Sequence, residues 1–202
     1  MIVTWSDPRV ARVPVRDCGE TLVDVRASAP LLVVSPSTYL RYGVVERLVT
    51  AQSLLPRTIR LLIVDGYRPA TLHCRHVTCA LEEAQLVCPD LPAADVDRLT
   101  GRCTTPPSVA PHPTGGAVDL TLSNEHVIEA PDAVLPTCCA GIVPPPADTT
   151  RQLLTSALTA VGMVNYPTRW WHWSYGDRFW AFSTQARYSR YGPLPGQVGT
   201  SG

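Results

Sequence analysis

His112 and Asp119 lie seven positions apart, and two glycines stand between them. Residues 116–122 alternate small or apolar side chains with polar ones, which is typical of a strand. The preceding residues include Pro113 and the glycine pair, which indicate a turn that lets the chain double back. A turn that enters a strand can bring an imidazole and a carboxylate to one point. Nitrogen and oxygen ligands of this kind suit Zn²⁺, whose catalytic sites usually have three protein ligands and one open position.

A third ligand is offered by His172, which lies among Trp170, Trp171 and Trp173. Neighbouring tryptophans can shield an imidazole from water and hold its ring direction, as a metal site requires. The same residues also fit an aromatic-rich core strand that runs from Trp170 to Tyr175. The two interpretations are compatible, because a core strand can end on a ligand.

Three segments are more informative together than apart: Asp-Gly-Tyr-Arg-Pro at 65–69, Ser-Val-Ala-Pro-His-Pro-Thr-Gly-Gly-Ala-Val-Asp-Leu-Thr-Leu at 108–122, and Trp-Trp-His-Trp-Ser-Tyr-Gly-Asp-Arg at 170–178. With these motifs in this order and spacing, the chain resembles the D-alanyl-D-alanine dipeptidase family (VanX type), zinc peptidases that cleave small dipeptides. The resemblance runs from about Tyr39 to the Tyr-Gly-Pro-Leu sequence at 191–194, and so covers most of the chain. It implies an α+β fold, with helices flanking a mostly antiparallel central sheet.

The resemblance also implies roles for individual residues. His112, Asp119 and His172 would bind one zinc ion per chain. Arg68 matches the family arginine that stabilises the charge developing on the scissile carbonyl oxygen. Taken from the residues alone, Arg68 is better interpreted as a solvated turn arginine before Pro69, and only the resemblance favours its role at the site.

Three further residues of the same motifs are expected at the substrate site. Asp65 can orient Arg68 through a bidentate ion pair. Asp65, Tyr67 and Trp171 are therefore interpreted as substrate-binding residues that accompany Arg68. The expected substrate is a dipeptide or another small molecule.

One departure from the family concerns its general base. The family carries a glutamate three residues before the last histidine ligand, where it takes a proton from the attacking water, and Arg169 occupies that position here. An arginine stays charged and cannot accept a proton. General-base help is worth typically ~10²–10⁴-fold, so ordinary dipeptidase activity is expected to be severely reduced or absent.

A second departure lies in 123–148, which does not match the family segment that holds the free amine, and which is interpreted as a lid or substrate loop.

The composition is that of a folded globular protein. The chain has 202 residues, 45% hydrophobic content and zero formal net charge, which predicts one domain over 1–202 with a loose tail at 193–202. Nothing indicates a nucleic-acid-binding patch or a polybasic membrane surface, and no apolar stretch approaches the ~18 residues of a transmembrane helix. No signal peptide is visible at the N-terminus, so the seven cysteines are expected to be mostly reduced in a cytoplasm.

Apolar periodicity and helix breakers predict elements that do not alternate regularly, as in an α+β domain. Helices are expected at 37–55, 70–87, 91–99 and 149–161. Thr149 or Thr150 can cap the last of these, and Gly162 fits its C-terminal end. The nearly all-apolar run at 59–65 is expected to be a central strand that is buried on both faces.

Other parts of the chain give weaker expectations. Three prolines are expected to break any helix within 1–30. Asp177 is expected to begin a hairpin that returns through 179–182. His73 and His76 share a helix face, and a solvated face is favoured over a second metal site there.

Three functions remain open at this point. The first is a zinc enzyme descended from the dipeptidases that acts on another small amino-acid-like or carboxylate-bearing substrate. Zinc would polarise a carbonyl, while Arg68 and Arg169 stabilise negative charge and Arg169 grips a carboxylate. The second is a true dipeptidase with a relocated general base, for which the candidates are Glu125, His126, Glu129 and Asp132. The third is a non-catalytic homologue that keeps zinc for structure, although a closed structural site would need a fourth protein ligand.

Overall fold

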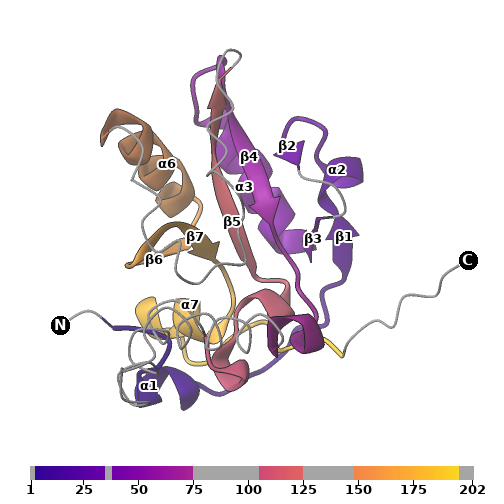
Figure 1. Ribbon diagram of the computed structural model, residues 1–202, viewed down its shortest axis with the longest axis vertical. Coiled ribbons are helices and arrows are strands. Elements are labelled where there is room, and N and C mark those ends of the chain that lie inside the picture. The colour runs from indigo at the N-terminus through magenta and orange to yellow at the C-terminus, as the bar shows by residue number, and fades with distance from the viewer. Residues whose placement is uncertain (1–2, 35–37, 75–104, 125–147, 196–202) are drawn as a thin grey trace, which may run out of the picture.

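A computed structural model describes residues 3–34, 38–74, 105–124 and 148–195. Within them, one sheet has the strand order β2–β4–β5–β7–β6. The bounds of its strands are β2 Val33–Val34, β4 Ile59–Asp65, β5 Ala117–Asn124, β6 Val164–Tyr166 and β7 Arg169–Ser174. β2 pairs with β4 in parallel, and the other neighbouring strands are antiparallel. Helices lie beside this sheet (Figure 1), so the predicted α+β class with a mostly antiparallel sheet is confirmed.

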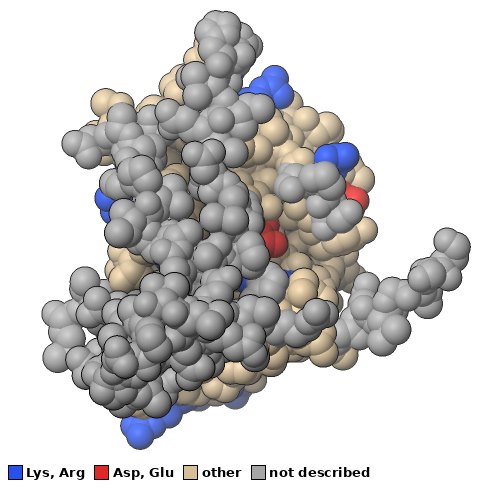
Figure 2. Space-filling view, viewed as in Figure 1, with Lys and Arg blue, Asp and Glu red and all other residues tan. Residues whose placement is uncertain are grey.

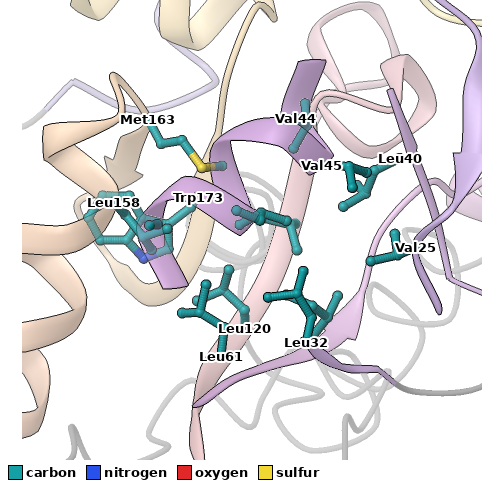
Figure 3. Close-up of a cluster of buried hydrophobic side chains, with 14 of the residues drawn as sticks. Val25, Leu32, Leu40, Val44, Val45, Leu61, Leu120, Leu158, Met163 and Trp173 are labelled. Carbon is teal, nitrogen blue, oxygen red and sulfur yellow. The ribbon is translucent and has the colours of Figure 1, made fainter. Parts of the chain in front are cut away.

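The main core lies between one face of the sheet and two helices, α3 (Tyr42–Ser53) and α6 (Asp148–Ala160). Figure 3 shows the buried side chains of these helices and of the strands gathered around a common centre. Val118 and Leu120 of β5 are fully buried in this cluster. Because side chains alternate across a strand, Asp119 projects from the opposite face of the sheet.

Short elements surround the sheet. Their bounds are α1 Pro8–Ala11, β1 Leu22–Asp24, α2 Val25–Ser28, β3 Tyr39–Arg41, the 3₁₀ turns η1 Pro107–Val109 and η2 His112–Thr114, and α7 Arg178–Ser183. β1 and β3 form a separate antiparallel pair. Helices α1 and α7 pack together at the lower end of the molecule in Figure 1. A second apolar cluster joins these segments, and it consists of Trp5, Val10, Val109, Tyr166 and Phe179.

Several predicted elements agree with the structure. β4 matches the predicted strand at 59–65, and α6 matches the predicted helix at 149–161 to within one residue at each end. Gly162 follows α6 with φ +78°, the left-handed conformation that suits a helix C-terminus. Because α6 begins at Asp148, the prediction that Thr149 or Thr150 caps it is wrong.

The prediction that β4 is buried on both faces is wrong. Leu61 and Ile63 are fully buried, but Arg60 on the other face is exposed. The difference arises because α3 and α6 cover one face of the sheet only.

The predicted helix at 37–55 begins late. Tyr39–Arg41 forms strand β3, which pairs with β1, and the helix starts only at Tyr42. Hydrogen bonds to β1, which precedes this segment in the chain, outweigh the local helical period, which short segments express weakly.

Two predictions, one for Asp177 and one for Pro8, are wrong. Asp177 does not begin a hairpin, because its carboxylate accepts a hydrogen bond from the Trp180 N–H at 2.7 Å and caps α7. Pro8 does not prevent a helix, because it occupies the first turn of α1, where a missing N–H is tolerated. Asp7 caps that helix by accepting from the Arg9 N–H at 2.9 Å.

The predicted helix at 70–87 starts at Ala70. His73 in its first turn is buried, with Nε2 2.9 Å from the Thr105 carbonyl oxygen, so the expectation of a solvated face is wrong for this histidine. His76, the rest of this helix and the predicted helix at 91–99 lie outside the described residues. Cys18 and Cys74 are not in a disulfide, the other cysteines lie outside the described residues, and the reduced state of the seven cysteines stays a prediction.

Two features bear on expected partners. No helix in the described part of the chain is long and apolar enough to span a bilayer. In Figure 2, the arginines that grey atoms do not cover lie apart from one another.

Candidate metal centre

Strand register brings two of the predicted ligands together. β5 and β7 are antiparallel neighbours, and Asp119 lies directly opposite His172. Directly opposed residues of paired strands project from the same face of a sheet. His172 Nδ1 accordingly lies 2.8 Å from Asp119 Oδ1.

The turn before β5 places the third predicted ligand, His112, beside Asp119. His112 begins η2, and Gly115 after it adopts φ +70°, so the chain reverses and enters the strand. The His112 ring is buried, with Nδ1 2.7 Å from the Gly66 carbonyl oxygen and Nε2 3.5 Å from Asp119 Oδ1. Donation from Nδ1–H to Gly66 fixes the tautomer in which Nε2 carries the free lone pair.

These three side chains form a site that can hold a metal ion. The candidate ligand atoms of His112, Asp119 and His172 lie within 4.8 Å of one another. Two imidazole nitrogens and one carboxylate oxygen are a donor set that zinc accepts in three-ligand sites. The carbonyl partner of His112 is the outer support that metal-binding histidines commonly have. The side chains of His112, Asp119 and His172 therefore fit the predicted zinc ion.

Burial and mutual charge tune the ligands. Burial alone would raise the pKa of Asp119, but His112 and His172 hold it well below its usual value. Burial lowers the pKa of His172 to about 4, against the opposing effect of Asp119. For His112, burial is outweighed by the charge and hydrogen bond of Asp119, and its pKa is raised. An ionised Asp119 and a neutral His172 are the forms that bind a metal.

Arg68 approaches the site from the end of β4. Its guanidinium forms an ion pair with Asp65, whose other oxygen accepts from the Gly66 N–H at 2.9 Å. The Arg68 backbone N–H donates to the His112 carbonyl oxygen at 3.3 Å. The predicted ion pair of Asp65 with Arg68 is thus present, but it is not bidentate, because only one Asp65 oxygen faces the guanidinium. The Arg68 side chain is 16% exposed, so the arginine is not simply a solvated turn residue.

Arg169 lies on the same side of the protein as the ligands. Its guanidinium carbon is 5.7 Å from the ring centre of Trp5 and 6.0 Å from that of Trp171. Its positive charge is one of the influences that lower the pKa of His172, after burial. Cation–π contacts of this length hold a guanidinium over the rings.

Two aromatic residues of the site were missed from the sequence. Trp5 meets the His172 ring edge to face at 5.0 Å between centres, and it stacks on Tyr166 at 3.4 Å with 4° between planes. Tyr166 also meets the His172 ring, at 6.2 Å. Trp5 is 161 positions from Tyr166, and no local pattern links residues at that distance. The predicted shielding of His172 by aromatic rings is supplied in part by these residues.

The sequence also did not predict an irregularity in the pairing of β6 with β7, the strand that carries His172. The register of β6 with β7 shifts between Asn165 and Tyr166. The side-chain amide of Asn165 donates to the carbonyl oxygens of Arg169, Trp170 and His172 at 2.9–3.1 Å. Such amide bridging satisfies strand carbonyls that the ladder leaves free.

The catalytic roles of Arg68 and Arg169, the substrate-binding roles of Asp65, Tyr67 and Trp171, and the lid all stay predictions. The Tyr67 hydroxyl is buried and has no hydrogen-bond partner among the described residues. Burial raises the pKa of this hydroxyl, and the positive charge of Arg41 opposes the shift. The proposed lid at 123–148, with Glu125, His126, Glu129 and Asp132, lies almost entirely outside the described residues.

Known proteins are similar to this chain. No family model matches it. A D-alanyl-D-alanine dipeptidase of Synechocystis is 24% identical over 226 residues, which cover 87% of this chain and 90% of that protein. A D-alanyl-D-alanine dipeptidase of Escherichia coli K12 is 32% identical over 126 residues, or 56% of this chain and 54% of that protein. A crystal structure of a mutant vancomycin-resistance D,D-pentapeptidase, VanY, with Zn(II) has a TM-score of 0.49 and 13% identity over 87% of this chain and 86% of that one. The resemblance to the D-alanyl-D-alanine dipeptidases that the three motifs indicate is thus confirmed over most of the chain, as that of a divergent relative.

Proposed function

We propose that the protein is a zinc-dependent enzyme, related to the dipeptidases, that acts on a small amino-acid-like substrate bearing a carboxylate. The observation that carries this proposal is Arg169, which stands where the family has its catalytic glutamate and lies over Trp5 and Trp171 beside His172. A fixed guanidinium at that place suits the binding of a carboxylate. It does not suit the removal of a proton.

Each residue of the site has a distinct role in this proposal. His112, Asp119 and His172 hold the zinc ion, which when bound supplies a Lewis acid to a carbonyl group. Arg68, held by Asp65, donates hydrogen bonds to the oxygen on which negative charge develops. Two cationic side chains thus flank the ligands, and both favour an anionic substrate or transition state.

A genuine D,D-dipeptidase is the second candidate, because both curated relatives carry that name. It requires a general base other than residue 169. The candidates named from the sequence, Glu125, His126, Glu129 and Asp132, lie outside the described residues. Turnover of D-Ala-D-Ala by the wild type separates this candidate from the first.

Zinc content and turnover of a dipeptide panel test the proposal on the purified protein. We expect one zinc per chain and no cleavage of D-Ala-D-Ala. Arg169→Glu restores a carboxylate at the position of the family base and is expected to create dipeptidase activity, by ~10²-fold or more over wild type. Arg57→Glu, at an exposed arginine before β4, makes the same charge change and should leave turnover unaltered.

Two outcomes would contradict the proposal. Useful cleavage of D-Ala-D-Ala by the wild type would favour a relocated base. Absence of zinc would remove the assignment of His112, Asp119 and His172, on which every other role depends.

A further inference from the structure

Trp5 is a buried residue of the N-terminal segment, 2% exposed, that packs beside the candidate metal centre. Its indole nitrogen is buried, and no partner for its N–H exists among the residues that the structure describes. Buried N–H groups nearly always have an acceptor, because the loss of water must be compensated. An indole N–H can only donate, so the missing partner is an acceptor.

The ring cannot easily turn to satisfy this donor elsewhere. Tyr166 stacks on Trp5 at 3.4 Å between ring centres, and the Trp5 backbone N–H donates to the Tyr166 hydroxyl at 3.2 Å. Phe179 contacts the same ring at 6.3 Å. The indole is therefore held in one orientation by neighbours that offer its N–H no acceptor.

The positive charge beside the indole favours an anion as the missing acceptor. The Arg169 guanidinium lies over the indole, 5.7 Å from its centre. The His172 ring, which belongs to the candidate metal centre, lies 5.0 Å from the indole. A carboxylate has two oxygens with several acceptor positions, and it can accept from the guanidinium and from an indole N–H at the same time.

We propose that Trp5 and Arg169 form one carboxylate-binding subsite beside the metal centre, in which the Trp5 indole N–H donates to the substrate carboxylate. This inference rests on the proposed function, and it adds a specificity-determining residue to it. A substrate without the carboxylate leaves the Trp5 indole N–H without an acceptor among the described residues. A site that is built to hydrogen-bond a substrate group discriminates strongly against analogues that lack the group.

Two thiols test the subsite on the zinc-loaded protein. A thiolate is a strong zinc ligand, and 3-mercaptopropanoate adds a carboxylate to it, whereas 1-propanethiol does not. We expect wild type to prefer 3-mercaptopropanoate in calorimetric titrations. Trp5→Phe keeps an aromatic ring but removes the N–H, and we expect the preference to fall by about tenfold, the size of a hydrogen bond to a charged group.

Matched variants separate the possible causes. Trp180→Phe removes an indole N–H that donates to the Gly162 carbonyl oxygen at 2.9 Å, and it should leave the preference unchanged. Arg169→Ala should reduce the preference further than Trp5→Phe does. Binding of 1-propanethiol by the same variants serves as the reference, so that a general change in the affinity of the zinc site for thiols cancels from the preference.

The outcomes distinguish this inference from the proposed function. Equal binding of the two thiols by wild type would overturn both. A preference that is lost in Arg169→Ala but intact in Trp5→Phe would overturn the role of Trp5 alone. It would mean that a water molecule satisfies the indole.

A second measurement avoids the variant, in case Trp5→Phe does not fold. The chain has five tryptophans, so a ¹⁵N-labelled sample gives few indole signals, and that of Trp5 is identified by its nuclear Overhauser contact with Tyr166. We expect this indole N–H to move downfield with 3-mercaptopropanoate and not with 1-propanethiol. A signal that stays in place while the carboxylate thiol binds would overturn the inference.

Discussion

Asp177 is a buried aspartate, 1% exposed, that caps α7 through the Trp180 N–H. Burial raises its pKa to about 6 from a usual value of 3.8. A carboxyl group with a raised pKa stabilises the folded state fully below its unfolded pKa, and the stabilisation is lost as the pH rises through the folded value. The free energy of unfolding should therefore contain a contribution that falls between pH 4 and pH 6.

Asp177→Asn tests this contribution, since asparagine also caps helices but does not titrate. The free energy of unfolding of the variant should lack this decrease. Between pH 4 and pH 6, the variant should therefore gain up to about 3 kcal/mol of stability relative to wild type. Urea unfolding at several pH values measures the difference between the two proteins. Parallel pH profiles would show that Asp177 does not titrate in this range.

At the scale of elements, the turn between η2 and β5 depends on a buried arginine. Arg41 of β3 donates to the Thr114 carbonyl oxygen at 2.8 Å and to the Gly192 carbonyl oxygen at 3.2 Å, and it pairs with Asp17 at 2.6 Å. Its own backbone N–H donates to the Gly115 carbonyl oxygen at 2.9 Å. One guanidinium thus connects the turn after His112 to the N-terminal and C-terminal segments.

Gly115 has little room for a side chain in this turn. A Cβ there would lie 2.6 Å from Leu22 Cδ2 and 3.2 Å from Arg41 Cγ, and the residue has φ +70°. Gly162 has φ +78° with nothing within 4 Å, so it provides a control for backbone strain alone. Gly162→Ala should cost about 1 kcal/mol of stability, and Gly115→Ala should cost more.

Zinc affinity distinguishes the two alanine variants further. Gly115→Ala displaces the turn that holds His112 and should weaken zinc binding, measured by competition with a chelator, by at least about tenfold. Gly162→Ala should bind zinc as wild type does. Equal affinities would mean that the turn does not position His112.

For the whole molecule, metal binding links parts of the chain that are far apart. The ligands come from η2, β5 and β7, and the unfolded chain does not hold them together. Zinc at about 100 times its Kd should therefore raise the free energy of unfolding by about 2.7 kcal/mol.

Thermal unfolding with and without zinc measures this effect. Asp119→Asn should abolish the zinc-dependent shift, because it removes the carboxylate that both histidines approach. Glu46→Gln, at an exposed position of α3, neutralises a carboxylate equally and should retain the shift. A shift that survives in Asp119→Asn would place the metal elsewhere.

The sequence by itself determined the features that depend on neighbours along the chain. A nearly all-apolar run predicted β4, alternation of apolar and polar residues predicted β5, and a helical segment with a glycine at its end predicted α6. The ligand types and the Asp65–Arg68 pair also followed from short motifs, because the partners lie within a few residues of each other or in segments with strong local signals.

Only the tertiary structure decided what depends on contacts between distant segments. Trp5 beside His172, the placement of Arg169 over two indoles and the pairing of Tyr39–Arg41 with β1 have no local pattern to indicate them. The cap at Asp177 was missed for a related reason, since a six-residue helix carries almost no periodicity and is stabilised by packing of Phe179 against Trp5 and Tyr166. Burial of a polar group and the direction of a side chain follow from the packing of the whole chain, and local sequence constrains them weakly.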